Sequence, residues 1–147
     1  MHFTVQNLIN IENEIKSNLS DLNIINLPKI IAVSKTFKID KILPLINYGH
    51  IDFGENKIQE AVDKWTEIKL KNSKIKLHMI GKLQTNKVKF AVKLFDYIHS
   101  VDNKKLAQKI ADEQKKKSKK IKNFIQVNIW YEEKKSCVKK TEVYDFI

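Results

Sequence analysis

Short apolar runs alternate with amphipathic stretches along most of the chain. The apolar runs are rich in β-branched and aromatic residues and predict strands at 29–33, 50–53, 76–80, 97–101 and 124–129. Apolar positions that recur every three or four residues predict helices at 3–20, 39–47, 57–70, 86–95 and 103–117. Alternation of strands and helices is typical of a parallel α/β sheet with right-handed crossovers.

The length of the repeating unit favours a barrel over an open, doubly wound sheet. Each strand–helix unit takes roughly 20–26 residues, close to what a (β/α)8 TIM barrel uses per unit. A doubly wound sheet would usually place a glycine-rich phosphate-binding turn after the first strand, whereas Ser34, Lys35 and Thr36 stand there. We therefore expect one partial barrel domain over residues 1–147, with an N-terminal helix and about five of eight β/α units.

Several residues are candidates for ending or starting the predicted helices. Asn103 can cap the helix that follows it, and Asn56 with Gln59 three residues on has the pattern of a capping box. Gly49 can end a helix in the left-handed region of backbone space. Gly81 follows an apolar run, at a point where the backbone can turn sharply or approach a ligand.

Polar side chains follow the predicted strands where each one ends. They are Ser34, Lys35, Glu55, Asn56, Gln84, Asn86, Ser100, Asp102 and Asn128. In a barrel these ends meet on one face, which is where active sites lie. Lys35 is the candidate for covalent chemistry, because an amine held in a pocket loses part of its solvation, has a lowered pKa and becomes a nucleophile. His78 lies within the third strand, where it either lines the interior or packs in the core.

Charge and composition narrow the class of protein. The net charge of +11 suggests nucleic-acid binding as a function. All 28 basic residues are lysine, however, so the chain lacks the arginine that recognises phosphate or guanine through two hydrogen bonds. We expect no specific nucleic-acid partner. No apolar run reaches the roughly 18 residues that would span a membrane, and the N-terminus does not resemble a signal peptide, so we expect a cytoplasmic protein. The single cysteine, Cys137, excludes an intramolecular disulfide.

Five segments, in the same order, resemble the pyridoxal phosphate homeostasis proteins, which are single-domain relatives of the alanine racemase barrel domain. The segments are AVSKT, HIDFGENKIQEA, HMIGKLQTNK, IHSVDN and FIQVNI, and the resemblance extends to about residue 129. It implies that Lys35 holds pyridoxal 5′-phosphate as an internal aldimine. It further implies that Asn56, His78, Ser100 and Asn128 line the ring side of the cofactor.

The resemblance also implies a carrier of the cofactor and not an enzyme. Racemisation needs a second base on the opposite face of the cofactor, and the racemases take it from a tyrosine of another domain. No second domain is expected in this chain. We therefore expect a non-catalytic protein that takes part in pyridoxal phosphate homeostasis.

Two departures from the family pattern concern the C-terminal part. The five units use nearly all 147 residues, so the last three units are expected to be missing, and with them the last two strands, around which the family holds the cofactor's phosphate. Tyr131 and Cys137 stand where the family has glycine, and a side chain at positive φ costs about 1 kcal/mol or more.

An open fragment would leave two sheet edges and the barrel interior uncovered. We therefore expect poor solubility of the isolated chain, or dependence on a complementing C-terminal fragment. The alternative to an impaired cofactor-binding protein is a decayed fragment that retains no cofactor binding.

Overall fold

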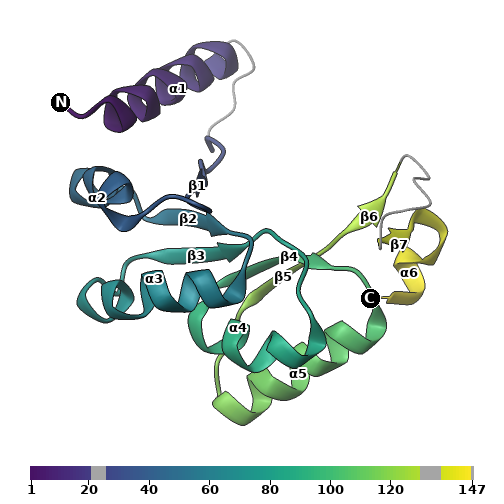
Figure 1. Cartoon of the computed structure of the whole chain (residues 1–147). Coiled ribbons are helices and arrows are strands. Elements are labelled where there is room, and N and C mark those ends of the chain that lie inside the picture. Colours follow the sequence, from purple (N-terminus) through teal and green to yellow (C-terminus); the bar gives the residue numbers. More distant parts are fainter. Residues whose placement is uncertain (21–25, 130–136, 147) are drawn as a thin grey trace.

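The structure is a computed structural model that describes residues 1–20, 26–129 and 137–146, and it contains one five-stranded parallel sheet (Figure 1). The strands are β1 (Ala32–Val33), β2 (Asp52–Glu55), β3 (Lys76–Met79), β4 (Tyr97–Val101) and β5 (Lys122–Ile125). Their spatial order is the order of the sequence, and all neighbouring pairs are parallel. The predicted parallel α/β class is confirmed, and the order does not reverse as it would in a doubly wound sheet.

The helices fall close to where the apolar periodicity predicts them. They are α1 (Phe3–Ser20), α2 (Ile39–Tyr48), α3 (Ile58–Lys71), α4 (Val88–Leu94), which follows the 3-10 turn η1 (Thr85–Lys87), and α5 (Lys104–Lys117). Helices α3, α4 and α5 lie along one face of the sheet, and α1 lies beside α2 (Figure 1). Val5 and Leu8 are the buried residues of α1. None of the described helices has the length and apolar content to cross a bilayer.

The core lies between the sheet and the helices that cover it. Phe53, Leu77 and Ile98 come from adjacent strands and are fully buried. Trp65 of α3 is also fully buried, with its ring centroid 4.9 Å from that of Phe53. Complete burial of a large apolar side chain contributes about 1.5–3 kcal/mol, so these residues fix the position of α3 over the sheet.

Two of the predicted helix ends are confirmed and one is wrong. Gly49 ends α2 with a left-handed φ of 103°, and Asn103 caps α5 by accepting a hydrogen bond from the Leu106 amide. The capping box does not form, because α3 begins after Lys57 and has no side-chain cap. Asn56 is instead packed against the backbone of Gly81.

The fifth predicted strand is divided. β5 ends at Ile125, and β6 (Val127–Asn128) leaves the sheet to pair in parallel with β7 (Val138–Lys139). A 3-10 turn, η2 (Lys140–Glu142), and a short helix, α6 (Val143–Phe146), follow. Tyr131, where we expect a cost from a side chain at positive φ, lies outside the described residues.

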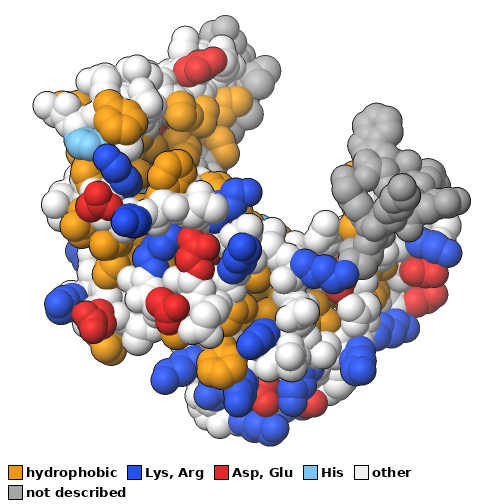
Figure 2. Space-filling view, viewed as in Figure 1, with side chains coloured by type: hydrophobic (Ala, Val, Ile, Leu, Met, Phe, Trp, Pro, Cys, Tyr) orange, Lys and Arg blue, Asp and Glu red, His pale blue; other side chains and the backbone are white. Residues whose placement is uncertain are grey.

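Both edges of the five-stranded sheet are open within the described part of the chain. β1 bonds only to β2, and β5 bonds only to β4. Lysine side chains are spread over several elements of the face shown in Figure 2, with acidic side chains among them. The predicted absence of a nucleic-acid partner and the predicted poor solubility remain predictions.

Candidate functional site at the carboxyl ends of the strands

The carboxyl ends of β1 to β4 bring four of the candidate positions to one edge of the sheet. Val33 is in register with Gly54, and Met79 with both Glu55 and Ile98, so Lys35, Asn56 and Gly81 follow strands that end side by side. Ser100 lies within β4, one residue before its end. The Ser100 hydroxyl donates a hydrogen bond of 2.6 Å to the Gly81 carbonyl. The expected convergence of polar residues at this edge is therefore seen for these positions.

Lys35 differs in one respect from the sequence-based expectation. Its side chain is exposed, and its amine makes no hydrogen bond or ion pair with any residue that the structure describes. The prediction of an amine held in a pocket is therefore wrong for this structure. The loop after β1 presents the amine to solvent, because its other polar groups turn toward β2 and α3.

Asn56 and Gly81 make the closest backbone approach at this edge. A Cβ atom placed on Gly81 would lie 2.3 Å from the carbonyl oxygen of Asn56, so only glycine fits. The side-chain oxygen Oδ1 of Asn56 is buried and has no hydrogen-bond partner among the described residues. Such a group costs about 1–3 kcal/mol, which a hydrogen-bond donor on a ligand would recover.

His78 lies inside β3, as the sequence predicts, and its side chain is buried. Its Nε2 is 2.9 Å from Asp52 Oδ1, and its Nδ1 is 2.9 Å from His99 Nε2. Its ring stacks on Tyr97, with centroids 4.2 Å apart. Burial, followed by the charge of His78, lowers the pKa of His99. The interior position that the sequence left open is the one observed.

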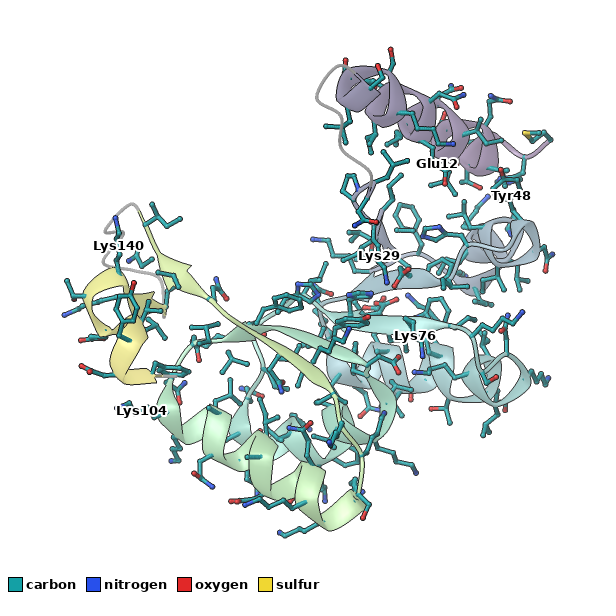
Figure 3. All side chains as sticks on the ribbon, turned by 180° about the vertical axis from the view of Figure 1, so that it is seen from behind. Glu12, Lys29, Tyr48, Lys76, Lys104 and Lys140 are labelled. Atoms are coloured by element: carbon teal, nitrogen blue, oxygen red, sulfur yellow. The ribbon has the colours of Figure 1, made fainter. Side chains whose placement is uncertain are left out.

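This histidine pair lies on the sheet face opposite α3, α4 and α5. Residues alternate between faces along a strand, and the neighbours Leu77 and Met79 pack in the core. Phe124 of β5 continues the ring contacts, with its centroid 4.6 Å from that of His99. Figure 3 shows the molecule from behind the view in Figure 1, with β5 in front of α4 and α5.

A buried carboxylate, Glu55, organises the polar contacts behind the candidate lysine. Its side chain is fully buried, and its Oε1 accepts hydrogen bonds from Ser34 Oγ (2.7 Å), Trp65 Nε1 (2.9 Å) and Lys64 Nζ (3.0 Å). Lys64 also donates to the Ser34 carbonyl at 2.8 Å and to Glu60 at 3.0 Å. These contacts join the loop after β1 to β2 and α3.

Sequence reasoning missed Glu60 and Lys64 as part of the site. Their spacing of four residues on a helix predicts an ion pair, which the structure contains. Nothing in that spacing shows that both side chains reach across to the loop after β1. Another candidate, Asn128, lies in β6 and therefore outside the five-stranded sheet.

The chemistry available at this edge is that of an amine with amide and hydroxyl groups around it. Within the described ranges, no group of three histidine, cysteine or acidic side chains could hold a metal ion. The amine of Lys35 can react with a carbonyl compound. The unpaired Oδ1 of Asn56 can accept a hydrogen bond from such a ligand.

Curated proteins that are similar in sequence share one name. The chain is 36% identical over 117 residues to the pyridoxal phosphate homeostasis protein of Pasteurella multocida, covering 80% of this chain and 50% of the relative. It is 42% identical over 113 residues to the protein of that name from Buchnera aphidicola, covering 76% and 49%. No protein-family model matches the chain.

Solved structures show the same fold. PipY of Synechococcus elongatus, solved without pyridoxal phosphate, is 31% identical with a TM-score of 0.72, covering 90% of this chain and 64% of PipY. PipY with pyridoxal phosphate bound gives the same identity and TM-score. A crystal structure of an unknown protein from Bifidobacterium adolescentis has a TM-score of 0.82 at 24% identity and shows the fold alone. By sequence and by fold, the chain is related to the pyridoxal phosphate homeostasis proteins and spans about half the length of the curated relatives it matches.

Proposed function

We propose that this chain binds pyridoxal 5′-phosphate in cofactor homeostasis and holds it covalently through Lys35. The proposal rests on two groups at neighbouring strand ends. The Lys35 amine after β1 is exposed, and the Asn56 Oδ1 after β2 is buried and has no hydrogen-bond partner among the described residues. The names of the curated relatives and the cofactor-bound form of PipY support it.

The residues at the edge have separate tasks in this proposal. Lys35 would hold the cofactor through its amine, and the cofactor would supply the aldehyde carbon for that bond, with loss of water. Asn56 accepts a hydrogen bond through its unpaired Oδ1. Ser100 holds the Gly81 backbone close to Asn56. His78 and Asn128 would line the ring side of the cofactor, further from the bond to Lys35. Both ring nitrogens of His78 already have partners, so it offers the cofactor no free hydrogen-bonding group.

The phosphate side of the cofactor requires groups outside those described at this edge. The chain contains no arginine, and it spans about half the length of its curated relatives. We propose that β/α units beyond β5, in the same chain or supplied by a separate C-terminal fragment, bind along the open edge of β5 and contribute the phosphate contacts. The whole barrel is then a cofactor carrier without catalytic turnover.

A chain that keeps the fold but no longer binds the cofactor is the second candidate. The exposure of Lys35 favours it, because no described side chain bonds to its amine or holds it in place for a ligand. The two candidates differ in one measurable property, the selectivity with which pyridoxal phosphate labels Lys35.

The deciding experiment is reductive trapping followed by peptide mapping. The chain is incubated with pyridoxal phosphate and reduced with borohydride, which delivers hydride to the C=N carbon and leaves a stable secondary amine. Preferential labelling of Lys35, lost in Lys35→Ala and kept in Lys41→Ala, is the expected result. Lys41 is a suitable control because it is another exposed lysine close in sequence. Labelling spread over surface lysines, and unchanged in Lys35→Ala, would support the second candidate.

A further inference from the structure

The backbone is held on both sides of Lys35 by side chains of β2 and α3. On one side, the Ser34 hydroxyl donates to Glu55 at 2.7 Å, and the Ser34 carbonyl accepts from Lys64 at 2.8 Å. On the other side, the Thr36 amide donates to Glu60 Oε1 at 2.7 Å. The residue between these two anchored positions is the exposed Lys35.

Lys64 connects the loop after β1 to both Glu55 and Glu60. An ammonium group has three N–H donors, and here they meet three acceptors: the Ser34 carbonyl, Glu55 Oε1 and Glu60 Oε1. The Lys64 side chain is only 9% exposed. Because its donors are all used and its amine is enclosed, Lys64 is a poor nucleophile, in contrast to Lys35.

Thr36 adopts a backbone conformation that its side chain disfavours. Its φ is +66°, in the left-handed region. A β-branched residue there is strained and persists only where the surroundings hold it. The bond from its amide to Glu60 is such a restraint. The hydrogen bond from Lys64, and then that from the Thr36 amide, lowers the pKa of Glu60, so the acceptor stays ionised.

We propose that Glu60 and Lys64 are positioning residues for Lys35. They hold residues 34–36 in the strained turn that places Lys35 at the carboxyl edge of the sheet, next to the end of β2. Without the hydrogen bond from the Thr36 amide to Glu60, the turn relaxes and the Lys35 amine takes up more positions. It can react with the ligand in only some of them. The inference rests on the proposed function, in which Lys35 is the residue that bonds to pyridoxal phosphate.

The test compares Glu60→Ala with Glu60→Gln. Alanine removes the acceptor for the Thr36 amide, whereas glutamine keeps a carbonyl oxygen at the same place. Glu67→Ala is the matched control, because Glu67 is an exposed acid further along α3. Amide hydrogen exchange at Thr36, the rate of borohydride-trapped labelling of Lys35 by pyridoxal phosphate, and the thermal unfolding midpoint are measured for each chain.

In Glu60→Ala, we expect Thr36 to exchange on the order of tenfold faster and Lys35 to be labelled on the order of tenfold more slowly, since a hydrogen bond to a charged group contributes enough for such a factor. In Glu60→Gln, the exchange rate of Thr36 and the labelling rate of Lys35 should return most of the way to those of the unmodified chain. Glu67→Ala should match the unmodified chain in both rates. Exchange and labelling in Glu60→Ala equal to those of the unmodified chain would overturn the inference.

Two further outcomes separate a positioning role from a purely structural one. A loss of labelling that follows the unfolding midpoint equally in Glu60→Ala and Glu60→Gln would show a structural role only and overturn the inference. Failure of the unmodified chain to label at Lys35 would overturn the proposed function, and with it the role of the turn in cofactor binding. The Thr36 exchange rates would then still report whether Glu60 restrains the turn.

Discussion

Replacement of Gly81 by alanine tests the close contact between the ends of β2 and β3. The added Cβ would lie 2.3 Å from the Asn56 carbonyl oxygen, 2.7 Å from its Cα and 2.8 Å from its Cβ, whereas real Cβ contacts stay beyond 3.0 Å. Two of these three atoms belong to backbone, so no rotation of a flexible side chain relieves the clash. The two loops must separate by at least 0.7 Å. Overpacking of this kind costs about 1–3 kcal/mol of the free energy of unfolding.

Two other glycines supply matched controls for this substitution. Gly49→Ala has open space around the new Cβ but a left-handed φ of 103°, so we expect a loss of about 1–2 kcal/mol from backbone strain alone. Gly54→Ala meets the methyl groups of Ile31 and Ile80 at 3.2 Å, which can move by a few tenths of an ångström. Its cost should therefore be the smallest of the three.

The assay is urea unfolding of all three variants, followed by pyridoxal phosphate labelling of Lys35 under folding conditions. Gly81→Ala and Gly49→Ala should lose similar stability, but only Gly81→Ala should also lose labelling, because it displaces Asn56. Unfolding of Gly81→Ala at the same urea concentration as the unmodified chain would contradict the expected clash. An equal loss of labelling in Gly49→Ala would contradict the link between Asn56 and the cofactor.

Two further predictions concern buried polar groups. Trp65→Phe removes one of three donors to the buried Glu55 carboxylate and should lower the free energy of unfolding by about 1–3 kcal/mol in urea titrations; unchanged stability would contradict the role of this bond. Burial, and then the neighbouring His78, lower the pKa of His99 from 6.5, so the unfolded chain binds a proton more readily than the folded one. Stability should therefore fall as the pH drops below about 6.5 and level off below the folded pKa, and His99→Gln should remove this dependence. Asp52 and His78 face the same cluster, so the variant is needed to assign the effect.

Hydrophobic periodicity was sufficient to predict most of the secondary structure. The five helices expected from apolar spacing match α1 to α5 to within about two residues at each end. The succession of strands also predicted a parallel sheet, since each strand connects to the next through a helix. These features depend on local pattern, which a sequence displays directly.

The errors arise where residues distant in sequence meet. Asn56 and Gln59 have the spacing of a capping box, but Gly81 packs against the Asn56 backbone and α3 starts later. The predicted strand at 124–129 is divided because β6 pairs with β7, which follows about ten residues later. Each competing contact comes from a segment that the local pattern does not include.

The candidate site was predicted only in part, because its remaining features also depend on contacts between residues distant in sequence. Lys35 and Asn56 were identified from strand ends, and the structure brings their strands together. The exposure of Lys35 and the left-handed Thr36 depend on how the loop meets α3, which neither position reveals alone. Lys64 was missed because a lysine with three acceptors has the same sequence signature as any other of the 28 lysines.

The sequential order of the strands has a consequence for how such a chain is made. Each strand of the five-stranded sheet bonds only to those of the units directly before and after it, so its pairings are complete as soon as the next unit emerges during synthesis. Folds built from neighbouring contacts gain stability one unit at a time, as repeat proteins do. Adding or removing units beyond β5 would therefore change which strand is last without altering the register of β1 to β4. The pairings of β1 to β4 therefore do not depend on any unit beyond β5.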